Sequence, residues 1–281
     1  MNSIVMNFDH YELNSDEFRI EYIQPKEYNI HWVRKEGVNT LIETKNLTKR
    51  FSEITAVEDL SFKVEKGEIF GLLGENGAGK TTTLRMLATM LQPTSGNAIL
   101  AGYDLVKQPK KVRSCIGILF GGDSGLYDRL TADENIAYFG RLNNMEESYL
   151  RERISELTEV FGMEEYIQRK AGKFSKGMKQ KVAFARSIVH NPDIMLFDEP
   201  TSGLDVSAIR NVHEFILECK SQGKSIILSS HTMSEVEKLC DRIGIIHKGK
   251  LVAQGSIAQL QDQHQGQSLE DIFIELAGDH K

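Results

Sequence analysis

The segment Gly74–Thr81, with the sequence G-E-N-G-A-G-K-T, constrains the fold of this 281-residue chain more than any other feature. It follows a short apolar run, Ile69–Leu73, which is typical of a buried strand. The spacing of Leu84, Leu87 and Leu91 by three and four residues predicts a helix directly after it. Unpaired N–H groups at the start of a helix hold anionic oxygens, and glycines let the backbone approach them. The segment therefore predicts a phosphate-binding loop between a strand and a helix.

The side chains of this loop predict how it holds a nucleoside triphosphate. Lys80 is expected to reach the β- and γ-phosphates, and the hydroxyl of Thr81 is expected to bind Mg²⁺. The predicted nucleotide contacts come from Gly74, Glu75, Asn76, Gly77, Ala78, Gly79, Lys80, Thr81 and Thr82.

Two later apolar runs end in polar side chains. Ile194–Phe197 precedes Asp198 and Glu199, and Ile226–Leu228 precedes the segment Ser229–His231. Buried parallel strands have this composition, and they deliver functional groups at their carboxyl ends. A proline after the two acids makes a turn, so capping of the next element is the alternative role for the pair. The phosphate loop upstream favours a role at the nucleotide.

A long stretch of chain separates Lys80 from Asp198, which indicates that a subdomain is inserted into the phosphate-loop fold. Within it, Glu146–Phe161 has an apolar face and is followed by Gly162, as expected of an amphipathic helix. A second helix is predicted after Phe174–Met178. The apolar positions behind these two predictions are Leu150, Ile154, Leu157 and Phe161, and then Val182, Phe184 and Ile188.

Five short signals follow one another in a fixed order, and together they resemble the ATPase subunit of an ABC (ATP-binding-cassette) transporter. The resemblance implies an α/β P-loop NTPase fold, the ABC ATPase cassette, with a β-subdomain, an inserted helical subdomain, and ATP and Mg²⁺ as ligands. Each signal occurs once, whereas ABC proteins of translation carry two cassettes, and no zinc spacing or long coiled coil marks a DNA-repair protein. A P-loop kinase would explain only the first signal. The signals are Gly74–Thr81, Phe174–Met178, Ile194–Glu199, Ser202–Asp205 and Ser229–His231.

The resemblance also implies roles for single residues in ATP hydrolysis. Asp198 would support Mg²⁺ beside Thr81, and Glu199 would polarise the attacking water as general base. His231 would contact the γ-phosphate, and Lys80 completes the expected catalytic group.

Other roles implied by the resemblance involve partners. Ser175 and Gly177 would bind the γ-phosphate of the ATP held by a second copy of the chain, and Asp205 would link the two sites of this ATP-sandwich dimer. Leu126–Phe139 lies where the family receives the coupling helix of an integral-membrane permease. Phe51 falls where the family places an aromatic ring on the adenine, with an ordinary core position as the alternative.

Two departures from the family pattern stand out. Phe174–Met178 reads F-S-K-G-M where the family usually has L-S-G-G-Q, so the serine and the second glycine are kept. The family also has a glutamine that touches Mg²⁺, placed after the strand that follows the phosphate-binding helix, and this chain lacks it. Gly121 or Gly122 takes its position, and what replaces it, Asp123 or a water, is left open.

Some segments narrow the resemblance to the NatA-type ATPases of bacterial sodium-export ABC transporters. They are Ile118–Gly122, Gly125–Ala132, Phe174–Lys181 and, in the tail, Ser268–Phe273. This implies an exporter ATPase that powers sodium efflux through a separate membrane permease. An exporter of a drug, peptide or lipid is the alternative, and a soluble non-transport ABC ATPase is a further one.

The expected organisation has three parts. Residues 1–39 form an N-terminal extension with a candidate β-hairpin around Gln24–Glu27. Residues 40–255 form the cassette, with the helical subdomain at roughly 125–185, and residues 256–281 form a short tail.

Composition limits the partners and the location. A net charge of −6 and a pI of about 5.8 give no electrostatic footprint for nucleic acid. No run approaches the roughly twenty apolar residues of a membrane-spanning helix. Together with the resemblance, which implies a membrane permease as partner, this predicts a cytoplasmic protein that is peripheral on the inner face of the cell membrane.

Overall fold

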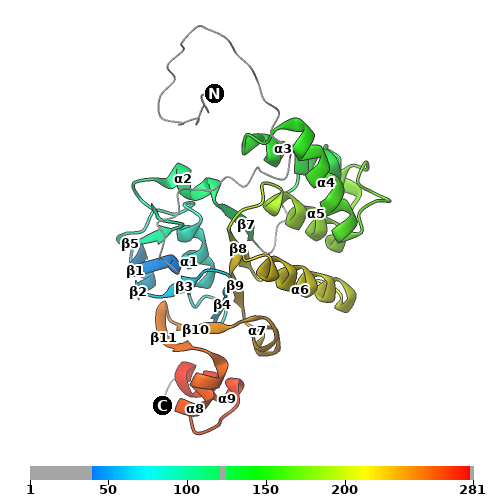
Figure 1. The fold of residues 1–281 in the computed structure, drawn as a ribbon. Helices are drawn as coiled ribbons and strands as arrows, with labels where there is room; N and C mark the ends of the chain where they lie inside the picture. The colour runs from blue at the N-terminus through cyan, green and yellow to red at the C-terminus, as the bar shows by residue number, and fades with distance from the viewer. Residues whose placement is uncertain (1–39, 121–124, 279–281) are drawn as a thin grey trace, which may run out of the picture. The chain divides into compact units, whose positions relative to one another are not determined.

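The computed structural model describes residues 40–120 and 125–278. The candidate hairpin of residues 1–39, and the stretch that contains Gly121, Gly122 and Asp123, lie outside the described residues. Two β-sheets and a group of helices make up the described part (Figure 1).

The larger sheet has six strands in the order β11-β10-β4-β9-β8-β7. Its neighbours are parallel except for β10 and β11. The strands β4, β8 and β9 are buried along their whole length, which confirms the three apolar strands predicted from the sequence. The strands are β4 (Ile69–Leu73), β7 (Ile116–Phe120), β8 (Ile194–Asp198), β9 (Ser225–Ser230), β10 (Arg242–His247) and β11 (Lys250–Gly255).

The register of the larger sheet brings the ends of its central strands together. Asp198 of β8 is paired with Ser229 of β9, and Leu73 of β4 is paired with Ser230. The chain segments that leave these strands therefore start at one edge of the sheet, where ligands bind in α/β folds.

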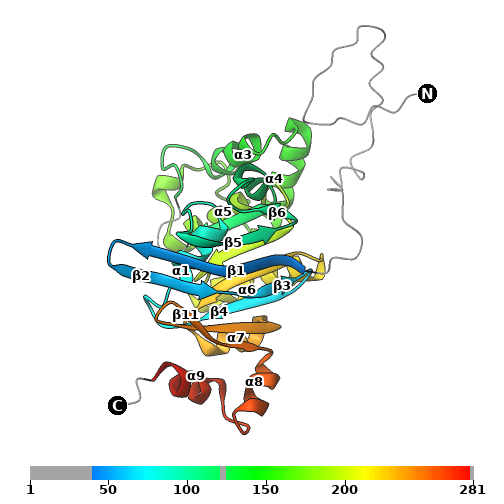
Figure 2. The same ribbon diagram turned by 90° about the vertical axis from the view of Figure 1, so that its left-hand side faces the viewer.

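The smaller sheet is antiparallel and follows the order β2-β1-β5-β6, with β3 paired to β1 (Figure 2). Its strands are β1 (Thr40–Phe51), β2 (Ile54–Leu60), β3 (Lys63–Glu65), β5 (Ser95–Leu100) and β6 (Tyr103–Asp104). Helix α1 (Lys80–Leu87) shares one core with both sheets, in which its Leu84 and Leu87 meet Ile42 of β1 and Leu72 of β4. The phosphate loop is thus supported from two sides.

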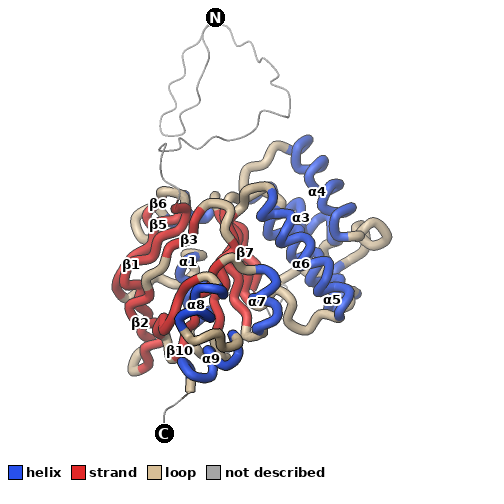
Figure 3. The backbone as a smooth tube through the Cα atoms, turned by 60° about the horizontal axis from the view of Figure 1, so that its bottom comes forward, coloured by secondary structure: helices blue, strands red, loops and turns tan. Residues whose placement is uncertain are grey.

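The helices α3, α4 and α5 gather at the end of the described part away from α8 and α9 (Figures 1 and 2). Figure 3 shows them as a group of blue helices to one side of the red strands. Helix α4 buries the four apolar positions predicted for it and ends at Gly162 in the left-handed conformation, which confirms the amphipathic helix. Helix α5 also lies where the sequence predicted it. The remaining bounds are α2 (Pro109–Ser114), α3 (Ala132–Leu142), α4 (Glu147–Phe161), the short 3₁₀ turn Ala171–Lys173, α5 (Lys176–Ile188), α6 (Val206–Ser221) and α7 (Met233–Leu239).

The C-terminal helices α8 (Ile257–Gln263) and α9 (Leu269–Ala277) pack on the edge of the larger sheet. Leu260 of α8 and Ile272 of α9 share a core with Ile243 and Ile245 of β10. Across residues 40–120 and 125–278, every helix is too short or too polar to cross a bilayer.

Candidate nucleotide site

The loop between β4 and α1 has no room for a side chain at two of its glycines. Gly79 immediately precedes α1 with a φ of 110°, and a Cβ there would lie 2.6 Å from the carbonyl oxygen of Ala56. A Cβ on Gly74 would lie 2.5 Å from the carbonyl oxygen of Ile246. The glycines therefore let the loop pack against neighbouring backbone and keep the N–H groups at the start of α1 close to a bound anion.

Lys80 holds the loop closed from within. Its Nζ donates hydrogen bonds to the carbonyl oxygens of Gly74, at 2.6 Å, and Glu75, at 3.1 Å. Only 4% of the residue is exposed, and this burial lowers the pKa of the amine, while the carboxylates of Glu199 and Asp198 oppose the shift. The Nζ lies 3.7 Å from Glu199 Oε1, so one cation faces both the loop and the acids of β8.

Asp198 is buried at the end of β8 and is held by two hydroxyls. Thr81 Oγ1 donates to its Oδ2 at 2.8 Å, and Ser229 Oγ donates to its Oδ1 at 2.5 Å. A threonine hydroxyl beside a carboxylate is a set of hard oxygen donors, which is the chemistry that Mg²⁺ prefers. The residues present therefore fit a magnesium ion bound with nucleotide phosphates.

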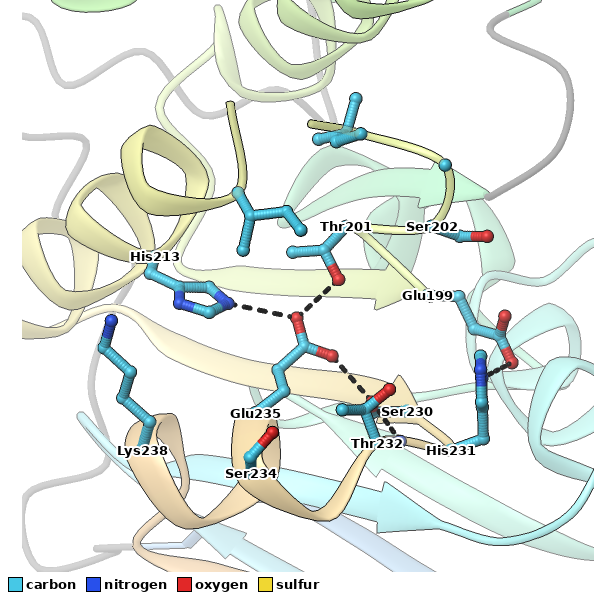
Figure 4. A pocket seen from close by; sticks show the side chains of 13 residues that line it. Glu199, Thr201, Ser202, His213, Ser230, His231, Thr232, Ser234, Glu235 and Lys238 are labelled. Atoms are coloured by element: carbon cyan, nitrogen blue, oxygen red, sulfur yellow. Dashed lines mark hydrogen bonds and ion pairs between the residues drawn. The ribbon is translucent and has the colours of Figure 1, made fainter. Parts of the chain in front are cut away.

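Glu199 follows with an unusual backbone conformation. Its φ is 48°, and its N–H donates to both the carbonyl and the hydroxyl oxygen of Ser229, at 3.2 and 3.0 Å. The side chain turns toward His231, whose Nδ1 lies 3.2 Å from Glu199 Oε1 (Figure 4). The imidazole is 52% exposed, so this end of the site is open to a ligand.

Next to this pair lies a cavity of about 490 Å³ between the segment after β8 and the start of α7 (Figure 4). A buried carboxylate, Glu235, lies in its wall together with His213. The sequence prediction did not include either residue. Both lie on helices outside the five signals. Glu235 contacts Thr201, 34 residues away in the sequence, and His213, 22 residues away, so no local sequence pattern predicts these contacts.

The residues expected to act across a dimer lie at helix starts, where Ser175 and Asp205 are exposed and Gly177 is half-buried. Ser175 is the N-cap of α5, where its Oγ accepts a hydrogen bond from Met178 N–H at 3.2 Å. Asp205 is the N-cap of α6 and accepts from Ala208 N–H at 2.9 Å. In the part of the chain that the structure describes, no hydrogen bond or ion pair joins Ser175, Gly177 or Asp205 to the phosphate loop.

Phe51 ends β1 with 44% of its surface exposed, so it is not a core residue. Lys49 Nζ lies 5.1 Å from the centre of its ring. The remaining predicted contacts fall into two groups: Glu75, Asn76 and Gly77 are exposed at the tip of the loop, while Ala78 is buried and Thr82 is half-buried.

Comparison with known proteins agrees with this geometry. The family model described as ABC transporter matches residues 57–202. The chain is 47% identical over 238 residues to the ABC transporter ATP-binding protein NatA of Bacillus subtilis (strain 168), and the match covers 83% of this chain and 97% of that protein.

Two solved structures give the same result. The structure of an ATP-binding subunit of an ABC transporter has a TM-score of 0.79 and 32% identity, and the match covers 84% of this chain and 99% of that one. The dimeric post-hydrolysis state of the ATP-binding cassette MJ0796, bound to ADP and Pi, has a TM-score of 0.71 and 25% identity, with 76% and 98% covered.

Proposed function

This chain belongs to the ABC transporter family as an ATP-binding subunit and an ATPase, and from that premise we propose that it powers sodium export through a separate membrane permease. It would act at the inner face of the cell membrane. The observation that carries the proposal is the match to NatA over nearly the full length of that protein, to which the segments Ile118–Gly122 and Gly125–Ala132 add support.

The residues of the site divide the work of hydrolysis. Lys80, now bonded to loop carbonyls, would turn its amine to the β- and γ-phosphates. Thr81 and Asp198 would hold Mg²⁺, which supplies charge neutralisation between the phosphate oxygens. Glu199 would orient and polarise the attacking water, and His231, whose Nδ1 lies 3.2 Å from this carboxylate, would contact the γ-phosphate.

We propose that two copies enclose two ATP molecules. The exposed start of α5, with Ser175 and Gly177, would complete the site of the other copy through its N–H groups. Asp205, at the start of α6, would lie at the same interface. The dimeric state of the MJ0796 cassette supports this arrangement.

The permease would dock beside α3. Tyr127 and Tyr138 are exposed there and their rings form an edge-to-face pair with centres 5.4 Å apart. Arg186 of α5 stacks over the ring of Phe139 at 4.5 Å, which fixes the back of this surface. An exposed aromatic surface formed by α3 and the segment before it suits a short helix of a membrane partner.

Transport in cells tests the proposal. Expressed with its membrane partner in a sodium-sensitive host, the chain should lower cell sodium and raise salt tolerance, and Lys80→Ala should abolish both because the γ-phosphate loses its cation. Lys66→Ala, which changes an exposed lysine, is the matched control. Unchanged growth in sodium, together with Lys80-dependent tolerance to a drug or peptide, would replace sodium by another cargo while the exporter ATPase stands.

A further inference from the structure

Glu235, on α7, is a buried carboxylate with no role in the reaction as described so far. Only 6% of the residue is exposed, although it lies four residues after the open His231. Burying a carboxylate is costly unless its oxygens accept hydrogen bonds. The hydrogen-bond partners of Glu235 therefore indicate which segments of the chain it holds in place.

The two oxygens of Glu235 accept hydrogen bonds from two segments of the site, the turn after β8 and the end of β9 (Figure 4). Oε1 accepts from the hydroxyl of Thr201, two residues after Glu199, at 2.7 Å. Oε2 accepts from the hydroxyl of Ser230, immediately before His231, at 2.6 Å. The N–H of Thr232, immediately after His231, donates in turn to Ser230 Oγ at 3.0 Å.

A third element anchors the same carboxylate from behind. His213 of α6 is buried, and its Nε2 lies 3.3 Å from Glu235 Oε1. The carboxylate is thus fixed between α6 and α7 while it holds the hydroxyls of Thr201 and Ser230. Movement of the Ser230 segment alone would leave the buried Oε2 without this hydrogen bond, and movement of the Thr201 segment alone would leave Oε1 with only the longer contact to His213, so the carboxylate favours one separation of the two segments.

We propose that Glu235 is a positioning residue for ATP hydrolysis, which holds the His231 loop at a fixed separation from the segment that follows Glu199. The separation that it sets keeps the 3.2 Å contact between His231 Nδ1 and Glu199 Oε1. This inference rests on the proposed roles of Glu199 and His231 in hydrolysis. The competing explanation is that Glu235 only ties α7 to α6 and adds stability.

The two explanations differ in steady-state kinetics of the purified full-length chain. Glu235→Ala should lower kcat by about tenfold or more, because a displacement of catalytic groups by about 1 Å can cost up to a hundredfold. KM for ATP should stay within about threefold, since the phosphate loop is untouched. Glu235→Gln, which keeps one acceptor oxygen, should recover part of the rate, and Glu237→Ala, on the exposed face of the same helix, should leave it unchanged.

Double variants identify the residue through which Glu235 acts. In a His231→Ala background, Glu235→Ala should cost less than about twofold, because the contact that it preserves is already absent. A further tenfold loss in that background would overturn the proposal, as would wild-type kcat in Glu235→Ala. Should Glu235→Ala fail to fold, Ser230→Ala and Thr201→Val remove its partners one at a time, and wild-type kcat in both would equally overturn it. If His231→Ala itself keeps the wild-type rate, the failure lies in the proposed role of His231.

Discussion

Replacing Glu199 by glutamine tests the chemistry of the site at its centre. The carboxylate lies 3.7 Å from Lys80 Nζ and 3.2 Å from His231 Nδ1, and its backbone is fixed by two hydrogen bonds to Ser229. Glutamine has the same shape, so these backbone bonds should survive and only the basic charge is lost. A positioned general base contributes about 10²- to 10⁴-fold to a rate. We therefore expect kcat to fall by that factor, which corresponds to about 3–5 kcal/mol of activation free energy.

The affinity of the Glu199→Gln protein for ATP should rise or stay unchanged. At 3.7 Å, the attraction between Lys80 and Glu199 is about 4.5 kcal/mol for an effective dielectric constant of about 20. In the wild type, the nucleotide phosphates compete with this carboxylate for the amine, and they are also repelled by it. Because glutamine removes both effects, the amine becomes more available to the γ-phosphate.

The measurement is phosphate release at saturating ATP, together with ATP binding by equilibrium methods at the same Mg²⁺ concentration. Glu237→Gln, an exposed substitution on α7, serves as the control for the loss of one charge. Turnover at the wild-type rate would remove Glu199 from the mechanism. Loss of ATP binding in parallel with turnover would show instead that the carboxylate supports the loop rather than the water.

Three further results are expected. In sedimentation, a Glu199→Gln protein should dimerise with ATP, and adding Ser175→Arg should abolish the dimer because bulk and charge would enter the partner's phosphate site. If the Glu199→Gln protein stays monomeric at high ATP, the result counts against the ATP-sandwich dimer, unless the permease is needed to bring the two cassettes together. Phe51→Ala should raise KM for ATP by roughly five- to a hundredfold at unchanged kcat, as expected for the loss of one stacking contact of about 1–3 kcal/mol, and an unchanged KM would exclude stacking. Gly77 and Gly79 both have a positive φ, which costs an alanine about 1–2 kcal/mol at either position, but only at Gly79 would the new Cβ also clash with a carbonyl oxygen. Gly79→Ala should therefore lower the free energy of unfolding, measured with denaturant, more than Gly77→Ala, and equal losses would contradict this.

The sequence predicted the central strands and the phosphate loop because their signals are local. An apolar run of four or five residues that is buried on both faces, such as Ile194–Phe197 of β8 or Ile69–Leu73 of β4, has a composition that reports its position directly. The prediction was less accurate at the end of α1, which stops at Leu87 although the apolar spacing continues to Leu91. The N–H groups of Met90 and Leu91 both donate to the carbonyl of Arg85, so the chain turns there while Leu91 still packs on the core. Apolar spacing reports burial, and it does not report where the helical hydrogen bonds stop.

The long-range contacts around the site could not be predicted from the sequence for a different reason. Ser229 is the example: the motif Ser229–His231 was interpreted for its histidine, and the first serine received no role. Its hydroxyl donates to Asp198 and accepts from Glu199 N–H, while its carbonyl accepts from that same N–H. These bonds require β8 and β9 to be neighbours in the observed register, in which Asp198 is paired with Ser229, and sequence spacing does not give a register between distant strands.

The double role of Ser229 explains how two adjacent acids come to face different partners. Successive side chains of an extended strand point to opposite faces, so Asp198 and Glu199 could not both face the nucleotide if β8 simply continued. The chain turns instead at Glu199, whose φ of 48° is a conformation that costs a residue with a side chain about 1–2 kcal/mol. The bonds from its N–H to Ser229 offset that cost, and the hydroxyl of the same serine holds Asp198 against Thr81. One residue of the neighbouring strand thereby directs the first acid toward Thr81 and the second toward His231.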